Sequence, residues 1–172
     1  MTTDSVTVRF HPSLYENGKV CLALLGTDIT RPTRTQKHSI LNVMTNIRSL
    51  LADENPVPEG SAFGVLPSEV TWLNRRICYN TVLLHEIIKV AVCDAVEDCL
   101  KGTTLCPIPL RNDILKHFQQ HCDQYEKVAR DQLPLAGSFM NDAFDGGIAI
   151  YKYENLLARL RNLRERVGPA SE

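Results

Sequence analysis

The chain has 172 residues, of which 44% are hydrophobic and 23% charged, and its formal net charge is -1. This length and composition are typical of one globular domain and exclude a disordered or fibrous protein. We expect neither a membrane nor a secreted protein, because no run of about eighteen apolar residues and no secretory leader are visible. Near-neutral charge gives no general attraction to nucleic acid.

The N-terminal third predicts one strand and one helix. Residues 6–10, VTVRF, alternate between apolar and polar positions and predict a short strand. A polar loop follows, and Ser39 then occupies the position of a helix cap. Apolar residues recur every three to four positions after it, so the sequence predicts an amphipathic helix over 39–52. A loop rich in proline and glycine leads on from there.

Three further helices are predicted. One begins at Ser68 and runs to about Leu100, with Asn80-Thr81 as a candidate interruption. The next begins after Pro109 and stops before Pro134. A glycine-containing loop then leads to ENLLARLRNLRERV, residues 154–167, whose leucines form one stripe and whose arginines form the other face. We expect those arginines to be solvated, and the alternative is a basic docking surface for a partner.

Strands are scarce in this pattern and lie near the N-terminus. A lone strand pair is not stable in water, so part of a sheet is expected to be missing. The sequence therefore predicts the α+β class, with a few N-terminal strands followed mostly by α-helices. An incomplete sheet edge predicts marginal stability or dependence on a partner.

Cys21 lies in the apolar run VCLALL, just after the Asn17-Gly18 turn. Free cysteines are often simply buried, so packing is one reading. A cysteine beside a tight turn can also be held open to solvent and react. The residue types alone favour packing, and a reactive thiol is the alternative. All six cysteines of the chain are expected to be reduced thiols in a protein without export signals.

The stretch FHPSLYENGKVCLALLG, residues 10–26, resembles the active-site signature of the ubiquitin-conjugating enzymes. His11 and Pro12 stand ten and nine residues before Cys21, the spacing found in that family. HSILNVMTNIRSLLADENP resembles the helix that follows the family's active site. YNTVLLHEIIKVAVCD and the stretch around CPIPLR are similar to the family's Z-type subgroup, which carries additional C-terminal helices.

The resemblance implies a truncated ubiquitin-conjugating fold that lacks the N-terminal half of the conjugating domain. Residues 1–100 would be the C-terminal part of the core, and residues 101–172 a helical extension packed on it. Cys21 would accept ubiquitin or a ubiquitin-like modifier as a thioester from an activating enzyme and pass it to substrate lysines. His11 would fix the active-site turn. Ubiquitin ligases are further expected partners, and no cofactor, metal, nucleic acid or membrane is expected. The resemblance implies that the protein is located in the cytoplasm and the nucleus.

Ser13 departs from the family pattern, because it stands where relatives carry an asparagine credited with supporting the oxyanion. Losing one such donor typically costs roughly a hundred- to a thousandfold in rate. Many relatives carry an acidic residue after the Asn-Pro pair. Glu59 is the only candidate for that residue here, and it does not stand at the matching position. An alternative is therefore a catalytically inactive variant that acts as a binding module in the ubiquitin pathway.

Other patterns favour ordinary packing. Four residues match part of a zinc site by type, namely Cys99, Cys106, His117 and His121, but six residues separate the cysteines where two to four are usual. The pair His85-Glu86 lacks the second histidine of a metalloprotease. Trp72 is expected to be a core residue, with a partner anchor as the alternative. Cys78 and Cys93 are expected to pack.

Overall fold

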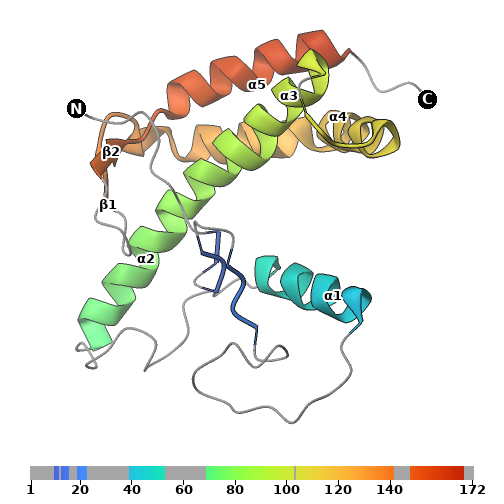
Figure 1. Cartoon of the computed structure of the whole chain (residues 1–172). Coiled ribbons are helices and arrows are strands. Elements are labelled where there is room, and N and C mark those ends of the chain that lie inside the picture. The colour runs from blue at the N-terminus through green and yellow to red at the C-terminus, as the bar shows by residue number, and fades with distance from the viewer. Residues whose placement is uncertain are drawn as a thin grey trace. The chain divides into compact units, whose positions relative to one another are not determined.

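The computed structural model describes residues 10–11, 13–15, 19–22, 39–52, 69–102, 104–141 and 148–168, with the side chains of 69–75, 141 and 148 excepted. These residues are mostly helical, with one small antiparallel sheet, which agrees with the α+β class (Figure 1). The chain divides into two compact units, one ending at Ile77 and the other beginning at Cys78. The expected domain boundary after residue 100 stays a prediction.

Helix α1, Ile40–Leu51, forms where the sequence predicts it. The Ser39 hydroxyl caps it by accepting a hydrogen bond from the Asn42 N–H at 3.2 Å. Its apolar face is largely solvent-exposed, since Leu41 is 73% and Met44 59% exposed. Within the described residues this helix therefore gains little from burial.

A long helical stretch runs from α2, Glu69–Glu86, through a π-helical segment, Ile87–Asp94, into α3, Ala95–Lys101. The predicted interruption at Asn80-Thr81 is wrong, because both residues lie inside α2. The departure from regular α-helix comes later, in the π-helical segment. The predicted start at Ser68 and the Trp72 side chain lie outside the described residues.

Helix α4, Ile108–Asp131, and helix α5, Tyr153–Val167, agree with the two predicted C-terminal helices. Pro109 is tolerated in the first turn of α4, where a missing N–H costs no helical hydrogen bond. The helix ends at Asp131, before Pro134. In α5, Leu156, Leu160 and Leu163 are at most 3% exposed, so the predicted leucine stripe is confirmed.

The small sheet pairs β1, Phe139–Asn141, with β2, Ile148–Ile150, in antiparallel register. The sequence predicts a loop here and strands near the N-terminus instead. Among the described N-terminal residues the only strand-like pairing is a single bridge between Leu14 and Val20. Residues 6–9 of the predicted first strand lie outside the described part of the chain.

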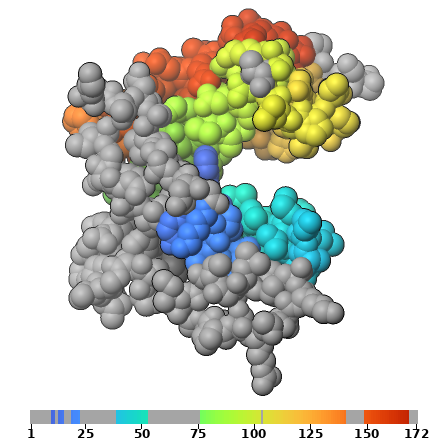
Figure 2. All heavy atoms as spheres, viewed as in Figure 1, coloured from blue at the N-terminus to red at the C-terminus, as the bar shows by residue number. Residues whose placement is uncertain are grey.

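The core of the C-terminal unit lies where α4 and α5 pack on each other and on the long helix (Figure 1). Figure 2 shows these helices in continuous contact on the face it presents. The buried side chains that meet there are apolar: Ile88, Val92, Val96, Phe118, Ala129, Leu156, Leu160 and Leu163. Helix-on-helix burial of this kind is the main stabilising contribution in an all-helical core.

Ion pairs join the arginines of α5 to acidic residues of the neighbouring helices. Arg159 contacts Asp94 and Glu97, and Arg164 contacts Asp123 and lies 3.3 Å from Glu126. The prediction of a purely solvated arginine face therefore holds only in part. The exposed ends of these side chains are bound to neighbouring carboxylates.

Candidate active site

Residues 13–15 and 19–21 form a short antiparallel ribbon. The Cys21 N–H donates to the Ser13 carbonyl at 2.8 Å, and Leu14 faces Val20 as the bridging pair. The sequence folds this way locally because an Asn-Gly pair stands between the two arms, and such pairs favour tight hairpin turns. The backbone of Cys21 is therefore fixed by a direct bond to residue 13.

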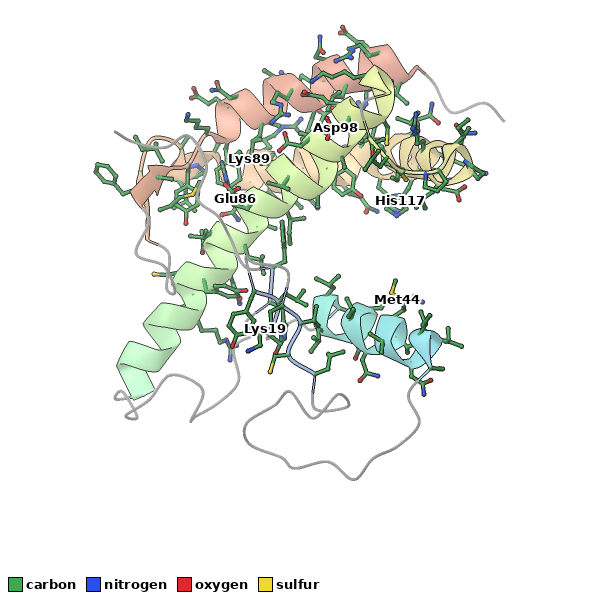
Figure 3. All side chains as sticks on the ribbon, viewed as in Figure 1. Lys19, Met44, Glu86, Lys89, Asp98 and His117 are labelled. Atoms are coloured by element: carbon green, nitrogen blue, oxygen red, sulfur yellow. The ribbon has the colours of Figure 1, made fainter. Side chains whose placement is uncertain are left out.

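A second pair holds the two arms together at the end next to residues 16–18. The Tyr15 N–H donates to the Lys19 carbonyl at 2.9 Å. The Lys19 ammonium also lies 5.3 Å from the centre of the Tyr15 ring, within the range of a cation–π interaction. Lys19 is exposed, and Figure 3 marks it. Backbone and side chains thus hold the two arms together.

Alternation along the strands assigns the side chains of the ribbon to two faces. Side chains of consecutive residues point to opposite faces, so those opposite the Leu14–Val20 bridge share the other face. That face carries Ser13, Tyr15, Lys19 and Cys21. The backbone pairing makes Ser13 the cross-strand neighbour of Cys21.

His11 anchors the start of the ribbon. Its side chain is buried, and its Nδ1 accepts a hydrogen bond from the Ser13 N–H at 3.0 Å. The Nδ1 must therefore be unprotonated, which leaves the ring proton on Nε2. The His11 carbonyl also accepts from the Leu14 N–H at 2.8 Å. His11, Ser13 and Cys21 are thus brought together by consecutive hydrogen bonds.

The Cys21 side chain is half-buried, neither sealed in a core nor fully exposed. A thiol on a fixed backbone with access to solvent can act as a nucleophile and as a leaving group. Other predicted parts of this site lie outside the described residues: Pro12, the Asn17-Gly18 turn, the loop after Leu22 and Glu59. The catalytic roles of Cys21, His11 and Ser13 stay predictions.

Comparison with known proteins places this ribbon in a family context. No family model matches the chain. The human ubiquitin-conjugating enzyme E2 Z is 40% identical over 167 residues, which cover 97% of this chain and 44% of that protein. Its Danio rerio counterpart is 38% identical over 97% of this chain and 48% of its own length. Over 97% of its length the chain is therefore similar to ubiquitin-conjugating enzymes.

The similarity extends beyond the ribbon, but it covers only part of the relatives. The chain spans about half the length of the ubiquitin-conjugating enzymes E2 Z that it matches, 44 to 50%. A probable ubiquitin-conjugating enzyme of Caenorhabditis elegans is 40% identical over 58 residues, 33% of this chain. The resemblance deduced from the sequence is therefore confirmed for the family.

The other cysteines lie in different surroundings from Cys21. Cys93 is 0% and Cys122 1% exposed, and burial raises the pKa of the Cys93 thiol to about 12. Burial also raises the pKa of the Cys122 thiol. The expected packing of Cys93 is confirmed, whereas Cys78 is only half-buried. A thiol that keeps its proton is a poor nucleophile, so Cys93 and Cys122 are unsuited to acyl transfer.

A buried polar network around His85 was not anticipated from the sequence. His85 and Glu86 are each 2% exposed, and His85 Nδ1 lies 2.9 Å from Glu86 Oε1. The Lys152 N–H donates to His85 Nε2 at 3.1 Å, so the ring proton must be on Nδ1 and point at Glu86. Lys89 Nζ lies 3.4 Å from the second Glu86 oxygen, and Figure 3 marks both residues. The network ties the long helix to the segment that leads into α5.

Two charged residues inside the otherwise apolar run VLLHEIIKV were the available signal for that network. A buried carboxylate needs partners, and here the imidazole and Lys89 supply them. Both ring nitrogens of His85 are occupied within the protein. The network is therefore suited to holding elements together rather than to binding a substrate.

The four residues considered as zinc ligands do not form one cluster. His117 and His121 stack with their ring centres 4.1 Å apart, and the His121 Nδ1 contacts the His117 carbonyl. In the part of the chain that the structure describes, no group of three or more His, Cys, Asp or Glu side chains could hold a metal ion. None of the described helices is both long and apolar enough to cross a membrane.

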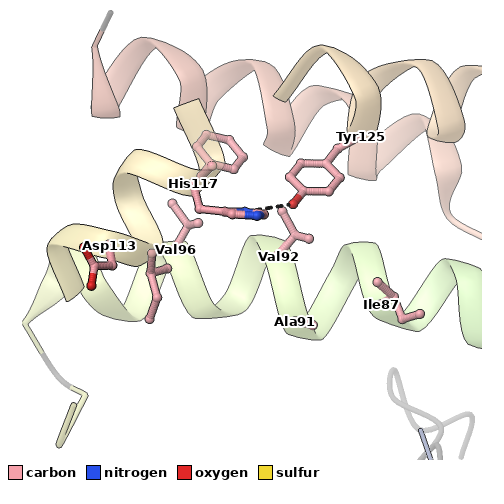
Figure 4. Close-up of a pocket in the computed structure, with 9 residues that line it drawn as sticks. Ile87, Ala91, Val92, Val96, Asp113, His117 and Tyr125 are labelled. Carbon is pink, nitrogen blue, oxygen red and sulfur yellow. Dashed lines mark hydrogen bonds between the residues drawn. The ribbon is translucent and has the colours of Figure 1, made fainter. Parts of the chain in front are cut away.

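A groove of about 430 Å³ lies between the long helix and α4 (Figure 4). Its lining is mainly apolar and includes Val92, Val96 and Phe118, with the Tyr125 hydroxyl 3.4 Å from His117 Nδ1 at the rim. Burial raises the pKa of the Tyr125 hydroxyl. The described residues that line this groove include no cysteine, so it offers no second thiol.

Proposed function

We propose that this chain is a carrier in ubiquitin conjugation, with Cys21 as the acceptor of the modifier. The single observation that carries the proposal is a half-buried thiol on a ribbon that His11 and Ser13 hold by hydrogen bonds. The 40% identity to the human ubiquitin-conjugating enzyme E2 Z supports it. The described ribbon would belong to a ubiquitin-conjugating fold.

The chemistry needs no metal and no bound cofactor. The Cys21 thiolate attacks the thioester carbonyl that joins ubiquitin, or a ubiquitin-like modifier, to the activating enzyme. A new thioester forms on Cys21, and the thiol of the activating enzyme leaves. A lysine amine of the substrate then attacks the same carbonyl, an amide forms, and the Cys21 thiol is released. Ligases would bring the substrate near.

His11 and Ser13 would act on the position of the thiol. The neutral His11 imidazole accepts from the Ser13 N–H, and the Ser13 carbonyl accepts from the Cys21 N–H. Two hydrogen bonds in series thereby connect the buried histidine to the backbone of the nucleophile. The Ser13 hydroxyl is the candidate donor to the oxyanion that forms during attack.

A charging assay tests the proposal. The full chain is incubated with ATP, activating enzyme and ubiquitin and separated without reductant. We expect an adduct that thiol reductant removes, and we expect Cys21→Ser to give only an adduct resistant to reductant or none. Cys78→Ser is a matched control, because that cysteine is also half-buried and lies in α2. A reductant-sensitive adduct that survives Cys21→Ser would overturn the assignment.

A binding module without catalysis is the second candidate, and Ser13 favours it. A serine hydroxyl reaches less far than an asparagine amide, so the oxyanion has a weaker donor. If the chain is a binding module, we expect it to fold and to bind ubiquitin or a ligase without forming a thioester. Titration of labelled ubiquitin with the uncharged chain, followed by NMR shifts, distinguishes the two.

A further inference from the structure

The turn between α3 and α4 is bracketed by two cysteines. Cys99 lies in the last turns of α3, and its carbonyl accepts from the Gly102 N–H at 3.3 Å. Gly102 has a φ of 68°, a conformation that glycine adopts without strain, and it sends the chain back toward α4. Cys106 stands directly before Pro107, the residue that caps α4.

One guanidinium group braces this turn. Arg111 Nε donates to the Cys106 carbonyl at 2.7 Å, and Arg111 Nη2 donates to the Thr104 carbonyl at 2.7 Å. Arg111 Nη1 lies 3.9 Å from the position that a Cβ would occupy at Gly102. The same side chain therefore lies against both arms of the turn and fixes the arm that carries Cys106.

The two thiols are both partly open to solvent, in contrast to Cys93 and Cys122, which are buried. Burial raises the pKa of the Cys99 thiol, and the nearby Cys106 thiol raises it further, whereas Arg111 opposes the rise. The two cysteines lie on the two arms of the turn that the Arg111 side chain contacts. Neither is needed for the chemistry proposed at Cys21.

We propose that Cys99 and Cys106 form a reversible disulfide that closes the α3–α4 turn, with a peroxide as the oxidant. The Cys106 thiolate attacks one peroxide oxygen, the O–O bond breaks, one water leaves, and a sulfenic acid forms. The Cys99 thiol then attacks that sulfur, the S–S bond forms, and a second water leaves. The peroxide accepts the two electrons that the two thiols lose, and thiol reductant reverses the reaction.

Cys106 reacts first in this scheme because burial raises the pKa of the Cys99 thiol and so lowers its thiolate fraction. The disulfide would also fix the segment that follows the turn. Leu105 and Ile108 in that segment are 102% and 68% exposed. The modification would therefore change how freely an exposed apolar loop moves, without a contact to the buried core.

Peptide mapping of the oxidised full chain tests the proposal. In a Cys21→Ser background, five of the six cysteines remain, and we expect mild peroxide to leave three titratable thiols and to remove two hydrogens from the intact mass. Trypsin cleaves after Lys89, Lys101 and Arg111, so the disulfide should join peptides 90–101 and 102–111. Fragmentation of that pair distinguishes Cys99 from Cys93, which lies on the same peptide.

Matched variants sharpen the result. Cys99→Ser and Cys106→Ser should each abolish the linked pair, and Cys78→Ser should leave it unchanged. Arg111→Gln removes the brace and should slow linkage while circular dichroism stays the same. Linkage of a different cysteine pair, or oxidation of Cys106 to sulfinic acid with Cys99 still a free thiol, would overturn the proposal. If a serine variant does not fold, peptide mapping of the Cys21→Ser chain decides alone.

Discussion

The ribbon around Cys21 and the helical core of the C-terminal unit are held together in different ways. Backbone hydrogen bonds and one imidazole acceptor fix the ribbon, and its two bridging residues are only half-buried. In the helical core, whole apolar side chains are sealed between α4, α5 and the long helix. Local bonds therefore specify the ribbon, and burial of apolar surface stabilises the core.

This difference predicts that mutations in the two regions have separate readouts. Truncating a core side chain removes burial and leaves a cavity, so the loss appears as free energy of unfolding. Changing a side chain on the Cys21 face of the ribbon leaves its backbone bonds in place, so the effect appears as reaction rate. The predictions below test that separation from the largest expected effect to the smallest.

Leu160→Ala should have the largest effect. Leu160 is 0% exposed in the middle of α5, and truncating such a leucine typically costs about 2–5 kcal/mol of unfolding free energy. Denaturant titration followed by circular dichroism measures the loss. Leu105→Ala is the control, because Leu105 is 102% exposed and its truncation should change stability by no more than about 0.5 kcal/mol. Equal losses for the two variants would show that α5 is not held by packing.

Ser13→Asn should act on rate and leave charging intact. Residue 13 forms hydrogen bonds to His11 and to Cys21 through its backbone, and its side chain takes part in neither. The amide adds a donor that reaches further, so discharge to free lysine should rise by up to about a hundred- to a thousandfold. Single-turnover discharge of purified thioester measures this.

Ser13→Ala provides the opposite test at the same position. It removes the hydroxyl donor, so discharge to lysine should be slower than in the unmodified chain while the reductant-sensitive adduct still forms. If serine, asparagine and alanine give the same discharge rate, the side chain at position 13 does not contact the oxyanion.

The helical core could largely be predicted from the sequence, because apolar residues recur every three to four positions along a helix that is buried on one side. Leu156, Leu160 and Leu163 of α5 recur at three to four residues, and all three are buried. The β1–β2 pair could not be predicted, since its strands are three residues long and Phe139 is 73% exposed, so no alternation is visible. The π-helical segment was missed because its altered hydrogen bonding leaves no mark in residue types.

The candidate site divides in the same manner. Cys21, His11 and Ser13 were found through a motif, because the spacing from His11 to Cys21 is short and local. The pairing of Ser13 with Cys21 needed the structure, since the residue types alone do not specify the register of the two arms. Burial of Glu86 was missed because a charged residue is ordinarily exposed, and its burial is tolerable only because His85 and Lys89 contact the carboxylate.

His85→Leu should produce an intermediate loss of stability. Leucine fills similar space but leaves Glu86 Oε1 and the Lys152 N–H without the imidazole, and the cost is about 1–3 kcal/mol. Denaturant titration measures it. His121→Leu is the comparison, because the His121 hydrogen bond to the His117 carbonyl is exposed and should be worth much less. A smaller loss for His85→Leu than for His121→Leu would contradict a structural role for the network.

Arg159→Gln should have the smallest effect, and that effect should depend on pH. Arg159 Nη2 lies 2.6 Å from Asp94 Oδ1 and 2.8 Å from Glu97 Oε1, and partly exposed pairs of this kind contribute about 0.2–1 kcal/mol. Burial by itself raises the pKa of the Glu97 carboxyl, but the hydrogen bond and charge of Arg159, together with Lys101, lower it overall.

A lowered pKa in the folded state means that the ion pair stabilises the protein above the ordinary carboxyl pKa of about 4.3. That stability is lost as the pH falls through the lowered value, because the protonated carboxyl no longer attracts the guanidinium. The unmodified chain should therefore be more stable than Arg159→Gln near neutral pH, and the two should converge in acid. Urea midpoints measured across this range give the difference. Arg161→Gln is the control, since its guanidinium is 3.9 Å from Glu126 and more exposed. A gap between Arg159→Gln and the unmodified chain that persists undiminished in acid would mean that Arg159 stabilises α5 by packing of its stem rather than by its charge.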